Sequence, residues 1–354
     1  MFREYHCFSF ILMIFVGSIA VGFSKYSFLF PNQEITSQKP IVQQLTGPVY
    51  HGEGPHWDAE KQLLFFVDIM GQRIYQYDPC SKRVTFADIG APVGAVIPLS
   101  GTTNKFVVGK KTTLSVVTWN GENSTSKIPI DEIDYIESNK PLNRFNDGKC
   151  DRAGRLWIGT MGNEDDNGVE PKQGTLYRLS DSCKLEARIR NVTISNGLAW
   201  SPDNLTMYYI DTETSRVDKL FYNVTTGDII DGSRQKVIDF REQNIAGSPD
   251  GMTIDNKGNL WIACWNGSKV INVDTKTGKV IYEIPLPVER VTSVAFGGKN
   301  FDILYITTMK KGLTAEQLKQ QPAAGALFSV TNLPVKGFYN SPVQNLPCLR
   351  SRGH

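Results

Sequence analysis

The sequence predicts an all-β fold, a six-bladed β-propeller with a central metal site at one mouth of its channel. A unit made of a polar turn and a following aromatic and β-branched run recurs along the chain. Its clearest copies are DAEKQLLFFVD (58–68), DRAGRLWIGT (151–160) and DNKGNLWIAC (255–264). This pattern is typical of a tight turn that leads into a buried strand. The copies recur at about 40–50 residues, the repeat length of propeller blades, without helical periodicity. A β-sandwich also has short, regularly spaced strands, but nothing in it requires one unit to recur at blade length.

Three further copies complete a set of six. SPDNLTMYYID (201–211) and GKNFDILYITT (298–308) are looser, and a degenerate unit fits between residues 94 and 120. In five units a second strand follows soon after, seen as RIYQYDP, GTLYRLS, VDKLFYN, SKVINVD and GALFSV. The repeats place the propeller at residues 45–338, between an N-terminal extension (25–44) and an irregular C-terminal tail (339–354).

The N-terminus predicts export. The apolar run FSFILMIFVGSIAVGF (8–23) contains small residues near its end and indicates a signal peptide over residues 1–24. An uncleaved membrane anchor is the alternative, because the run is at the edge of the ~17–25 residues that span a bilayer. Either interpretation places the propeller outside the cytosol, and we expect a secreted protein. Five N-x-S/T sequons are then plausible glycosylation sites, at Asn123, Asn191, Asn204, Asn223 and Asn266.

Charge and cysteine content narrow the partners and the chemistry. The net charge is +2 with no basic block, so composition gives no basis for binding nucleic acid or an anionic membrane surface. With the leader removed, we expect no stable membrane association.

Removal of the leader also leaves five cysteines, an odd number. Cys150 and Cys264 lie in apolar strand contexts and are expected to be buried thiols. A disulfide would draw on Cys80, Cys183 or Cys348, and the pairing is open.

The turn residue that opens each repeat gives a common reference position. Five residues before it, four repeats carry an oxygen-bearing side chain: Glu53, Asn146, Asn196 and Asp250. Taken singly, Asn-Gly and Asp-Gly pairs are typical of turns, but turn chemistry does not require a glutamate at the matching position. Equivalent positions of a propeller form a ring around its axis, so these side chains would converge. Converging carboxylates repel one another unless a cation neutralises them, and an all-oxygen set favours Ca²⁺, Mg²⁺ or Mn²⁺, with Zn²⁺ also possible.

Four longer motifs carry a family resemblance: EGPHWD (53–58), RFNDGKCDRAGRLWIGTM (144–161), NGLAWSPD (196–203) and SPDGMTIDNKGNLWIACWNG (248–267). They closely resemble the regucalcin, senescence marker protein and gluconolactonase family, which includes insect luciferin-regenerating enzymes. The resemblance extends from about Leu45 to about Phe338, and it implies that one divalent cation, Ca²⁺ first among the candidates, is held by Glu53, Asn196 and Asp250. Asp250 would also act as the base or position the attacking water.

The same resemblance assigns a substrate-binding set. Arg144, Asn146 and Glu164 match positions that hold substrate hydroxyl or carbonyl groups, which moves Asn146 from the cation to the substrate. Asp147 would support the site from behind the ligands. The acidic segment 162–173 lies on the expected substrate side and is either a lid or a solvated loop.

The function implied is hydrolysis of a sugar lactone, as in gluconolactonases, or of a related cyclic ester, with the metal as a Lewis acid. The substrate would be a small lactone or ester, and the sequence does not name it. No G-x-S-x-G motif is present, which argues against a serine hydrolase. Three alternatives stay open: an extracellular calcium-binding or carrier propeller without turnover, a luciferin-regenerating type of enzyme, and an organophosphate hydrolase.

Overall fold

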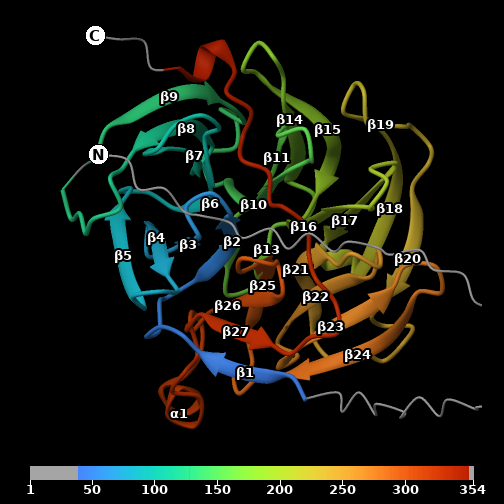
Figure 1. The fold of residues 1–354 in the computed structure, drawn as a ribbon. Helices are drawn as coiled ribbons and strands as arrows, with labels where there is room; N and C mark the ends of the chain where they lie inside the picture. The colour runs from blue at the N-terminus through green and yellow to red at the C-terminus, as the bar shows by residue number, and fades with distance from the viewer. Residues whose placement is uncertain (1–38, 127, 351–354) are drawn as a thin grey trace, which may run out of the picture. The chain divides into compact units, whose positions relative to one another are not determined.

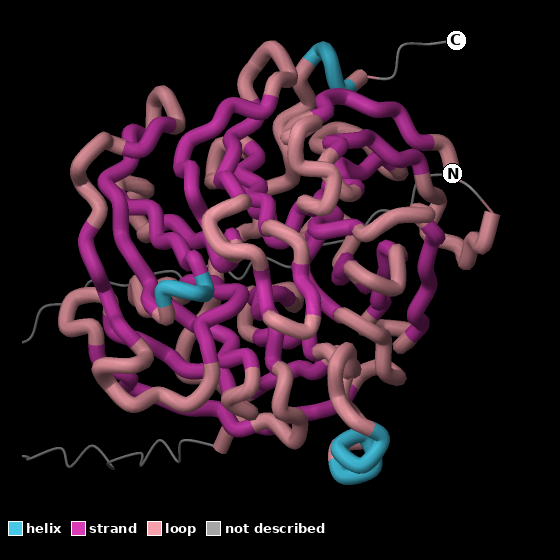
Figure 2. Tube along the Cα trace, turned by 180° about the vertical axis from the view of Figure 1, so that it is seen from behind, coloured by secondary structure: helices cyan, strands magenta, loops and turns pink. Residues whose placement is uncertain are grey.

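The computed structural model describes residues 39–350 apart from residue 127. The expected signal segment (1–24) and most of the expected extension therefore lie outside the described residues. Six antiparallel sheets, five of four strands and one of five, stand around a common axis (Figure 1). Figure 2 shows that helix is confined to a few short pieces between and after these sheets. The predicted all-β, six-bladed propeller is confirmed.

The strands of each blade are given from the axis outwards. The first blade comprises β2 (Gly52–Asp58), β3 (Leu63–Asp68), β4 (Arg73–Asp78) and β5 (Arg83–Asp88), and the second comprises β6 (Val93–Pro98), β7 (Lys105–Lys110), β8 (Thr113–Thr118) and β9 (Ile130–Tyr135). The third comprises β10 (Arg144–Cys150), β11 (Leu156–Met161), β14 (Gly174–Leu179) and β15 (Leu185–Val192). A two-stranded hairpin interrupts the third blade, made of β12 (Glu164–Asp165) and β13 (Gly168–Val169).

The fourth blade comprises β16 (Ser195–Trp200), β17 (Thr206–Asp211), β18 (Arg216–Asn223), β19 (Asp228–Ile229) and β20 (Gln235–Asp239). The fifth comprises β21 (Ser248–Ile254), β22 (Leu260–Trp265), β23 (Lys269–Asp274) and β24 (Lys279–Pro285). The sixth comprises β25 (Val291–Gly297), β26 (Ile303–Thr308), β27 (Phe328–Thr331) and β1 (Ile41–Gln44). The helical pieces are η1 (Thr212–Thr214), α1 (Ala315–Gln320) and η2 (Pro347–Leu349). In the described part of the chain, no helix has the length and apolar character needed to cross a bilayer.

The ring closes by joining the two ends of the propeller. Strand β1 pairs with β27 in antiparallel register, with Ile41 opposite Thr331 and Gln44 opposite Phe328. This strand lies ahead of the propeller start predicted at residue 45, which is corrected to residue 41. A lone, mostly exposed outer strand of sequence IVQQ carries no turn-plus-aromatic unit, so the repeat gave no signal there.

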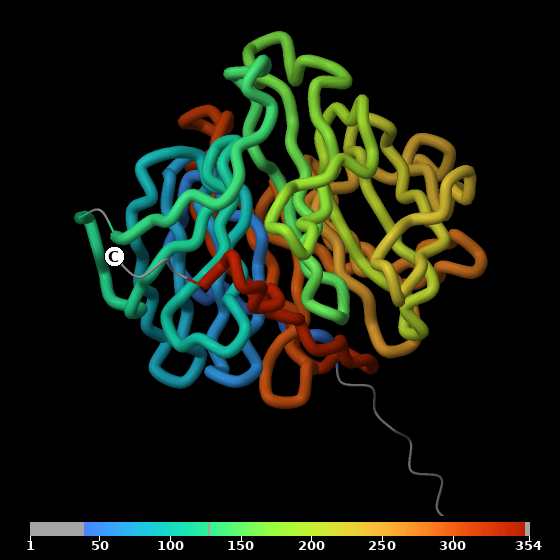
Figure 3. Tube along the Cα trace, turned by 90° about the horizontal axis from the view of Figure 1, so that it is seen from above, coloured from blue at the N-terminus to red at the C-terminus, as the bar shows by residue number. Residues whose placement is uncertain are grey.

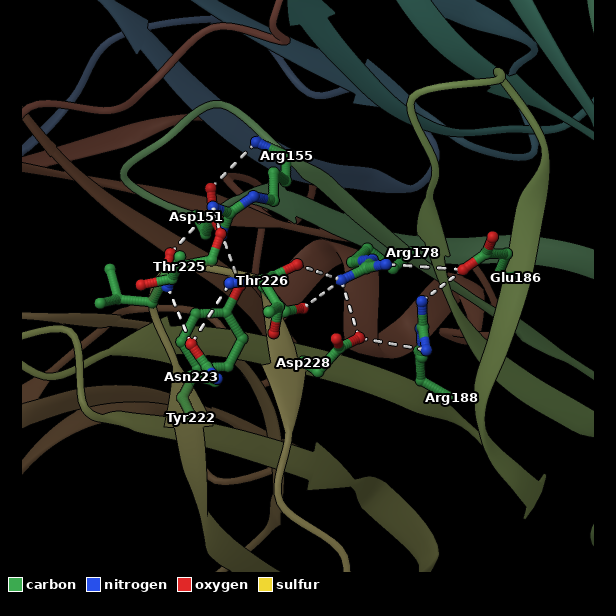
Figure 4. Close-up of polar contacts among 12 residues, drawn as sticks. Asp151, Arg155, Arg178, Glu186, Arg188, Tyr222, Asn223, Thr225, Thr226 and Asp228 are labelled. Carbon is green, nitrogen blue, oxygen red and sulfur yellow. Dashed lines mark hydrogen bonds and ion pairs between the residues drawn. The ribbon is translucent and has the colours of Figure 1, made fainter.

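One of the aspartates that open the repeats, Asp151, joins its blade to the next. Asp151 accepts hydrogen bonds from the Tyr222 hydroxyl of the fourth blade (2.6 Å) and from Arg155 (2.9 Å) (Figure 4). Arg178 also reaches across, donating to the carbonyl oxygens of residues 226 and 227 and to the Asp228 carboxylate. The third and fourth blades are thus held together by these polar contacts as well as by packed aromatic rings.

The C-terminal tail lies across one end of the ring (Figures 1 and 3). Val343 donates its backbone N–H to Pro98 in the second blade, and Gln344 donates to Gly154 in the third. Near its end the tail is joined to the third blade by a disulfide between Cys183 and Cys348. As predicted, Cys150 and Cys264 are buried thiols; Cys80 is exposed and free.

Candidate functional site

A cavity of about 210 Å³ opens at the end of the ring where the inner strands begin. Six of the seven predicted site residues line it: Glu53, Arg144, Asn146, Glu164, Asn196 and Asp250. The seventh, Asp147, is buried beside them and does not line the cavity. The structure therefore brings together residues that are up to 197 positions apart in the sequence (Glu53 to Asp250).

β-Bulges direct these side chains towards the axis. In β10, β16 and β21 two residues of the inner strand oppose one residue of the second strand, and the first of the two is Asn146, Asn196 or Asp250. In β2 the register breaks directly after Glu53. A bulge twists a strand locally and re-aims a side chain, and bulges are frequent next to active sites. The common offset seen in the sequence thus marks the first bulged residue in three blades and the residue directly before the bulge in β2.

Three carboxylates are crowded at this centre. Burial raises the pKa of Glu53 well above its ordinary value, and repulsion from Asp250 and Asp147 raises it further, while Arg144 lowers it. Burial also raises the pKa of Asp250 well above its ordinary value, with Asp147 adding to the rise. The pKa of Asp147 itself is raised by burial and lowered by the nearby Lys149. With all three carboxylates ionised, their charge of −3 would exceed the +2 of Arg144 and the half-buried Lys149.

The Asn196 amide presents an unpaired oxygen at the same centre. Its Nδ2 donates to the Thr212 hydroxyl (2.9 Å), and that hydroxyl donates in turn to the Pro249 carbonyl oxygen (2.9 Å). Because the Thr212 hydrogen is committed to Pro249, the hydroxyl must accept from Asn196, which fixes the orientation of the amide. The Asn196 Oδ1 is buried and has no hydrogen-bond partner among the described residues. Such an atom costs about 1–3 kcal/mol if nothing binds it.

The oxygen atoms at this centre are suitable ligands for a hard divalent cation. Two buried carboxylates, from Glu53 and Asp250, and the free Asn196 carbonyl oxygen are the ligand types that Ca²⁺ and its relatives prefer. Among residues 39–350 without residue 127, no three His, Cys, Asp or Glu side chains form a group that could hold a metal ion. A cation held here would therefore draw on an amide oxygen as well as on carboxylates.

Asn146, in contrast, has both ends of its amide bound. Its Oδ1 accepts a hydrogen bond from Arg144 Nη1 (2.8 Å), and its Nδ2 donates to the Ser195 carbonyl oxygen (3.0 Å). Arg144 Nη1 also donates to the Phe145 carbonyl oxygen (3.1 Å). Asn146 thus holds the Arg144 guanidinium in place in the cavity wall.

The β12–β13 hairpin brings Glu164 over the cavity. One Glu164 oxygen lies 3.9 Å from Arg144 Nη2, and the other lies 2.6 Å from Lys311 Nζ on the opposite side of the ring. The backbone of Lys311 is fixed, since its N–H donates to the Tyr50 carbonyl oxygen and its carbonyl oxygen accepts from Arg290. The hairpin of the third blade is thereby tied to the segment that follows β26 in the sixth blade.

The sequence reasoning missed two groups of residues here. Lys311 occupies no repeat position, and nothing in the sequence indicated its partner. The repeat could, however, have indicated the second group, which stands at the end of the second strand of each blade. The tripeptides GTM, ACW and TTM place Met161, Trp265 and Met309 at equivalent positions, and the corresponding residue of the fourth blade is Thr212. All four line the cavity.

Comparison with known proteins identifies the relatives of the chain. Residues 51–310 match the family model described as the SMP-30/Gluconolactonase/LRE-like region. Regucalcin from Xenopus laevis is 39% identical over 288 residues, which cover 81% of this chain and 92% of the relative, and regucalcin from Homo sapiens is 38% identical over 288 residues with the same coverage.

Solved structures agree with this relationship. A luciferin-regenerating enzyme superposes with a TM-score of 0.80 at 37% identity, covering 86% of this chain and all of the other (100%). Regucalcin from Agrobacterium tumefaciens, described as a calcium-binding protein, gives a TM-score of 0.76 at 26% identity over 86% of this chain and 97% of the other. The chain belongs to the SMP-30/gluconolactonase/LRE-like family of β-propellers.

Proposed function

We propose that the protein is a metal-dependent hydrolase of a lactone, a sugar lactone or a related cyclic ester. The observation that carries this proposal is the centre itself: two buried carboxylates and an unpaired amide oxygen face a cavity whose wall also holds a buried, pre-positioned arginine. Membership of a family whose model description names gluconolactonase supports the same reading.

The bound cation, held by Glu53, Asn196 and Asp250, would supply Lewis acidity at the substrate carbonyl. Hydrolysis adds one water across the ring ester: the acyl C–O bond breaks, the water oxygen joins the new carboxylate, and the released alkoxide oxygen takes a proton. Asp250 is the group placed to accept the proton from the attacking water at its carboxylate oxygen. Arg144, kept in one orientation by Asn146, would hold the substrate through charged, forked donors. Glu164 would accept hydrogen bonds from substrate hydroxyls on the outer side of the cavity.

The test is hydrolysis of aldonolactones by protein stripped with a chelator and reloaded with Ca²⁺, Mg²⁺, Mn²⁺ or Zn²⁺. Turnover should depend on added metal, and Asp250→Asn should lower kcat by about 10²–10⁴-fold. Asp166→Asn changes an exposed aspartate in the turn of the β12–β13 hairpin and serves as the matched control. Turnover that persists in chelator, or that survives Asp250→Asn, would remove the mechanism.

A binding protein without turnover is the second candidate, because a relative of 26% identity is described as calcium-binding. Calorimetric Ca²⁺ titration separates the two functions: tight binding together with no hydrolysis of any lactone or ester favours the carrier. A luciferin-regenerating type of activity is a further variant of the enzyme, supported by the 37% identity to such an enzyme.

We also propose that the protein is exported and glycosylated. The Cys183–Cys348 disulfide is a cross-link of the kind that persists in oxidising compartments. Four of the five sequon asparagines are exposed, and Asn204 is half-buried. Expression with the native leader in a secretory host, followed by peptide mapping of the mature N-terminus and of each sequon, tests both points; retention of the full leader with no glycan would contradict them.

A further inference from the structure

The cavity has a second, apolar zone that the hydrolytic machinery does not use. Met161 ends β11, Trp265 ends β22, and Met309 directly follows β26, so three blades present a large apolar side chain at the same point of the repeat. Ile194 and Val169 complete the lining between them. These five residues are called the collar below. Met161 and Met309 are only 3% and 5% exposed, so their surfaces turn inwards, to the protein and the cavity.

The two zones come from different strands of each blade. The oxygen-bearing residues stand on the first strands, which lie next to the axis, whereas Met161, Trp265 and Met309 stand on the ends of the second strands, one step further out. A molecule whose carbonyl group sits among Glu53, Asn196 and Asp250 would therefore direct its substituents outwards, against the collar.

Trp265, the largest member of the collar, is held in place before any ligand binds. The Arg290 guanidinium lies 5.4 Å from the centre of the Trp265 ring, a cation–π contact. Arg290 is itself anchored by hydrogen bonds to the backbone carbonyl oxygens of Lys311 and Gly312. Trp265 is also paired in the sheet with Ser248, another residue of the cavity wall. An apolar surface fixed in this way binds without the loss of side-chain freedom that a mobile one would suffer.

Four of the five collar residues are Met, Ile or Val, whose side chains offer no strong hydrogen bond to a hydroxyl group; only Trp265 carries a donor, its indole N–H. A fully hydroxylated ring would have to leave hydroxyls unpaired against them, whereas each methylene that the collar removes from water strengthens binding about fourfold, the equivalent of ~0.8 kcal/mol. The cavity wall also holds polar side chains, Arg144, Glu164 and Glu213 among them, so a ligand that matches the wall has both a polar and an apolar part.

We propose that the substrate is an amphipathic lactone or ester, with its carbonyl end at the polar centre and an alkyl or aryl substituent packed on the collar. This rests on the proposed hydrolase function and narrows its substrate class, away from fully hydroxylated sugar lactones.

The experiment compares δ-lactones that share one ring: δ-valerolactone, its 5-alkyl derivatives with progressively longer chains, and glucono-δ-lactone. kcat/KM should rise about fourfold per methylene until the collar is filled, and glucono-δ-lactone should fall below the alkyl derivatives. Met309→Gln, which conserves side-chain length but adds a polar amide, should flatten the rise with chain length. Met70→Gln alters an exposed methionine outside the cavity and should change nothing.

A flat series, or a preference for glucono-δ-lactone, overturns the proposal. If no lactone is hydrolysed, the proposed function fails, and the collar is then tested by calorimetric binding of the matching 6-alkyl δ-lactams, which resist hydrolysis. The same fourfold gain per methylene, lost in Met309→Gln, would support the apolar subsite without turnover; equal affinity for all chain lengths would refute it.

Discussion

Thr212 provides a direct test of the cation site, because it orients a ligand without being one. Its hydroxyl accepts from Asn196 Nδ2 and donates to the Pro249 carbonyl oxygen, each at 2.9 Å. Thr212→Val keeps the shape of the side chain and removes both hydrogen bonds. The Asn196 amide then loses the contact that fixes its orientation and keeps its Oδ1 away from Thr212. A buried donor left unpaired costs about 1–3 kcal/mol, and loss of a residue that orients a ligand lowers metal affinity by about 10–100-fold, so the two magnitudes agree.

The assay is calorimetric Ca²⁺ titration of chelator-treated protein. The Kd of Thr212→Val should rise by about 10–100-fold, whereas Thr212→Ser, which keeps the hydroxyl, should remain near the wild-type value. Thr214→Val is the matched control, because Thr214 in the same 3-10 helix donates only to the Asp211 carbonyl oxygen. A folded Thr212→Val variant with wild-type Ca²⁺ affinity would show that Asn196 is not a ligand.

Three further outcomes follow from contacts away from the centre. Lys311→Met removes the ion-pair partner of Glu164, so KM for substrate should rise about two- to fivefold with little change in kcat, measured in steady-state kinetics. Tyr222→Phe removes the hydroxyl that donates to the third blade, and urea unfolding should show a loss of about 1.5–3 kcal/mol. Cys348→Ser opens the disulfide of the tail; the free energy of unfolding should fall by about 2–4 kcal/mol, reductant should reproduce the effect on wild-type protein, and Cys80→Ser should have none.

The sequence could predict whatever the repeat encodes. A unit that recurs at blade length defines six sheets, and equivalent positions of the unit must meet at the axis. For this reason Glu53, Asn146, Asn196 and Asp250 were grouped from spacing alone, and all four line one cavity. Their individual roles needed side-chain geometry. Spacing treated Asn146 and Asn196 alike, whereas the structure shows one amide with both ends bound and the other with a free oxygen.

Contacts outside the repeat gave no such signal. Lys311 meets Glu164 across 147 positions (311 − 164), and Cys183 meets Cys348 across 165, yet neither pair occupies equivalent repeat positions. The strand β1 is likewise invisible to the repeat, because it completes a blade whose other strands come from the far end of the chain. Long-range pairings of this kind depend on where the ring closes, and only the folded chain specifies that.

The glycines after the functional residues explain why these motifs resemble turns. Asn196-Gly197 and Asp250-Gly251 suggest two-residue hairpins, but neither glycine has the positive φ that such a turn requires. A β-carbon at Gly197 would lie 2.8 Å from the Asp250 carbonyl oxygen, and one at Gly251 would lie 2.0 Å from the Ser293 hydroxyl oxygen. Each glycine is therefore required because the inner strand of the next blade passes directly against it. The close approach brings Asn196 next to Asp250, so the packing of one bulge on the next creates the polar centre. A larger residue at Gly197 would push β16 away from β21 and so separate Asn196 from Asp250.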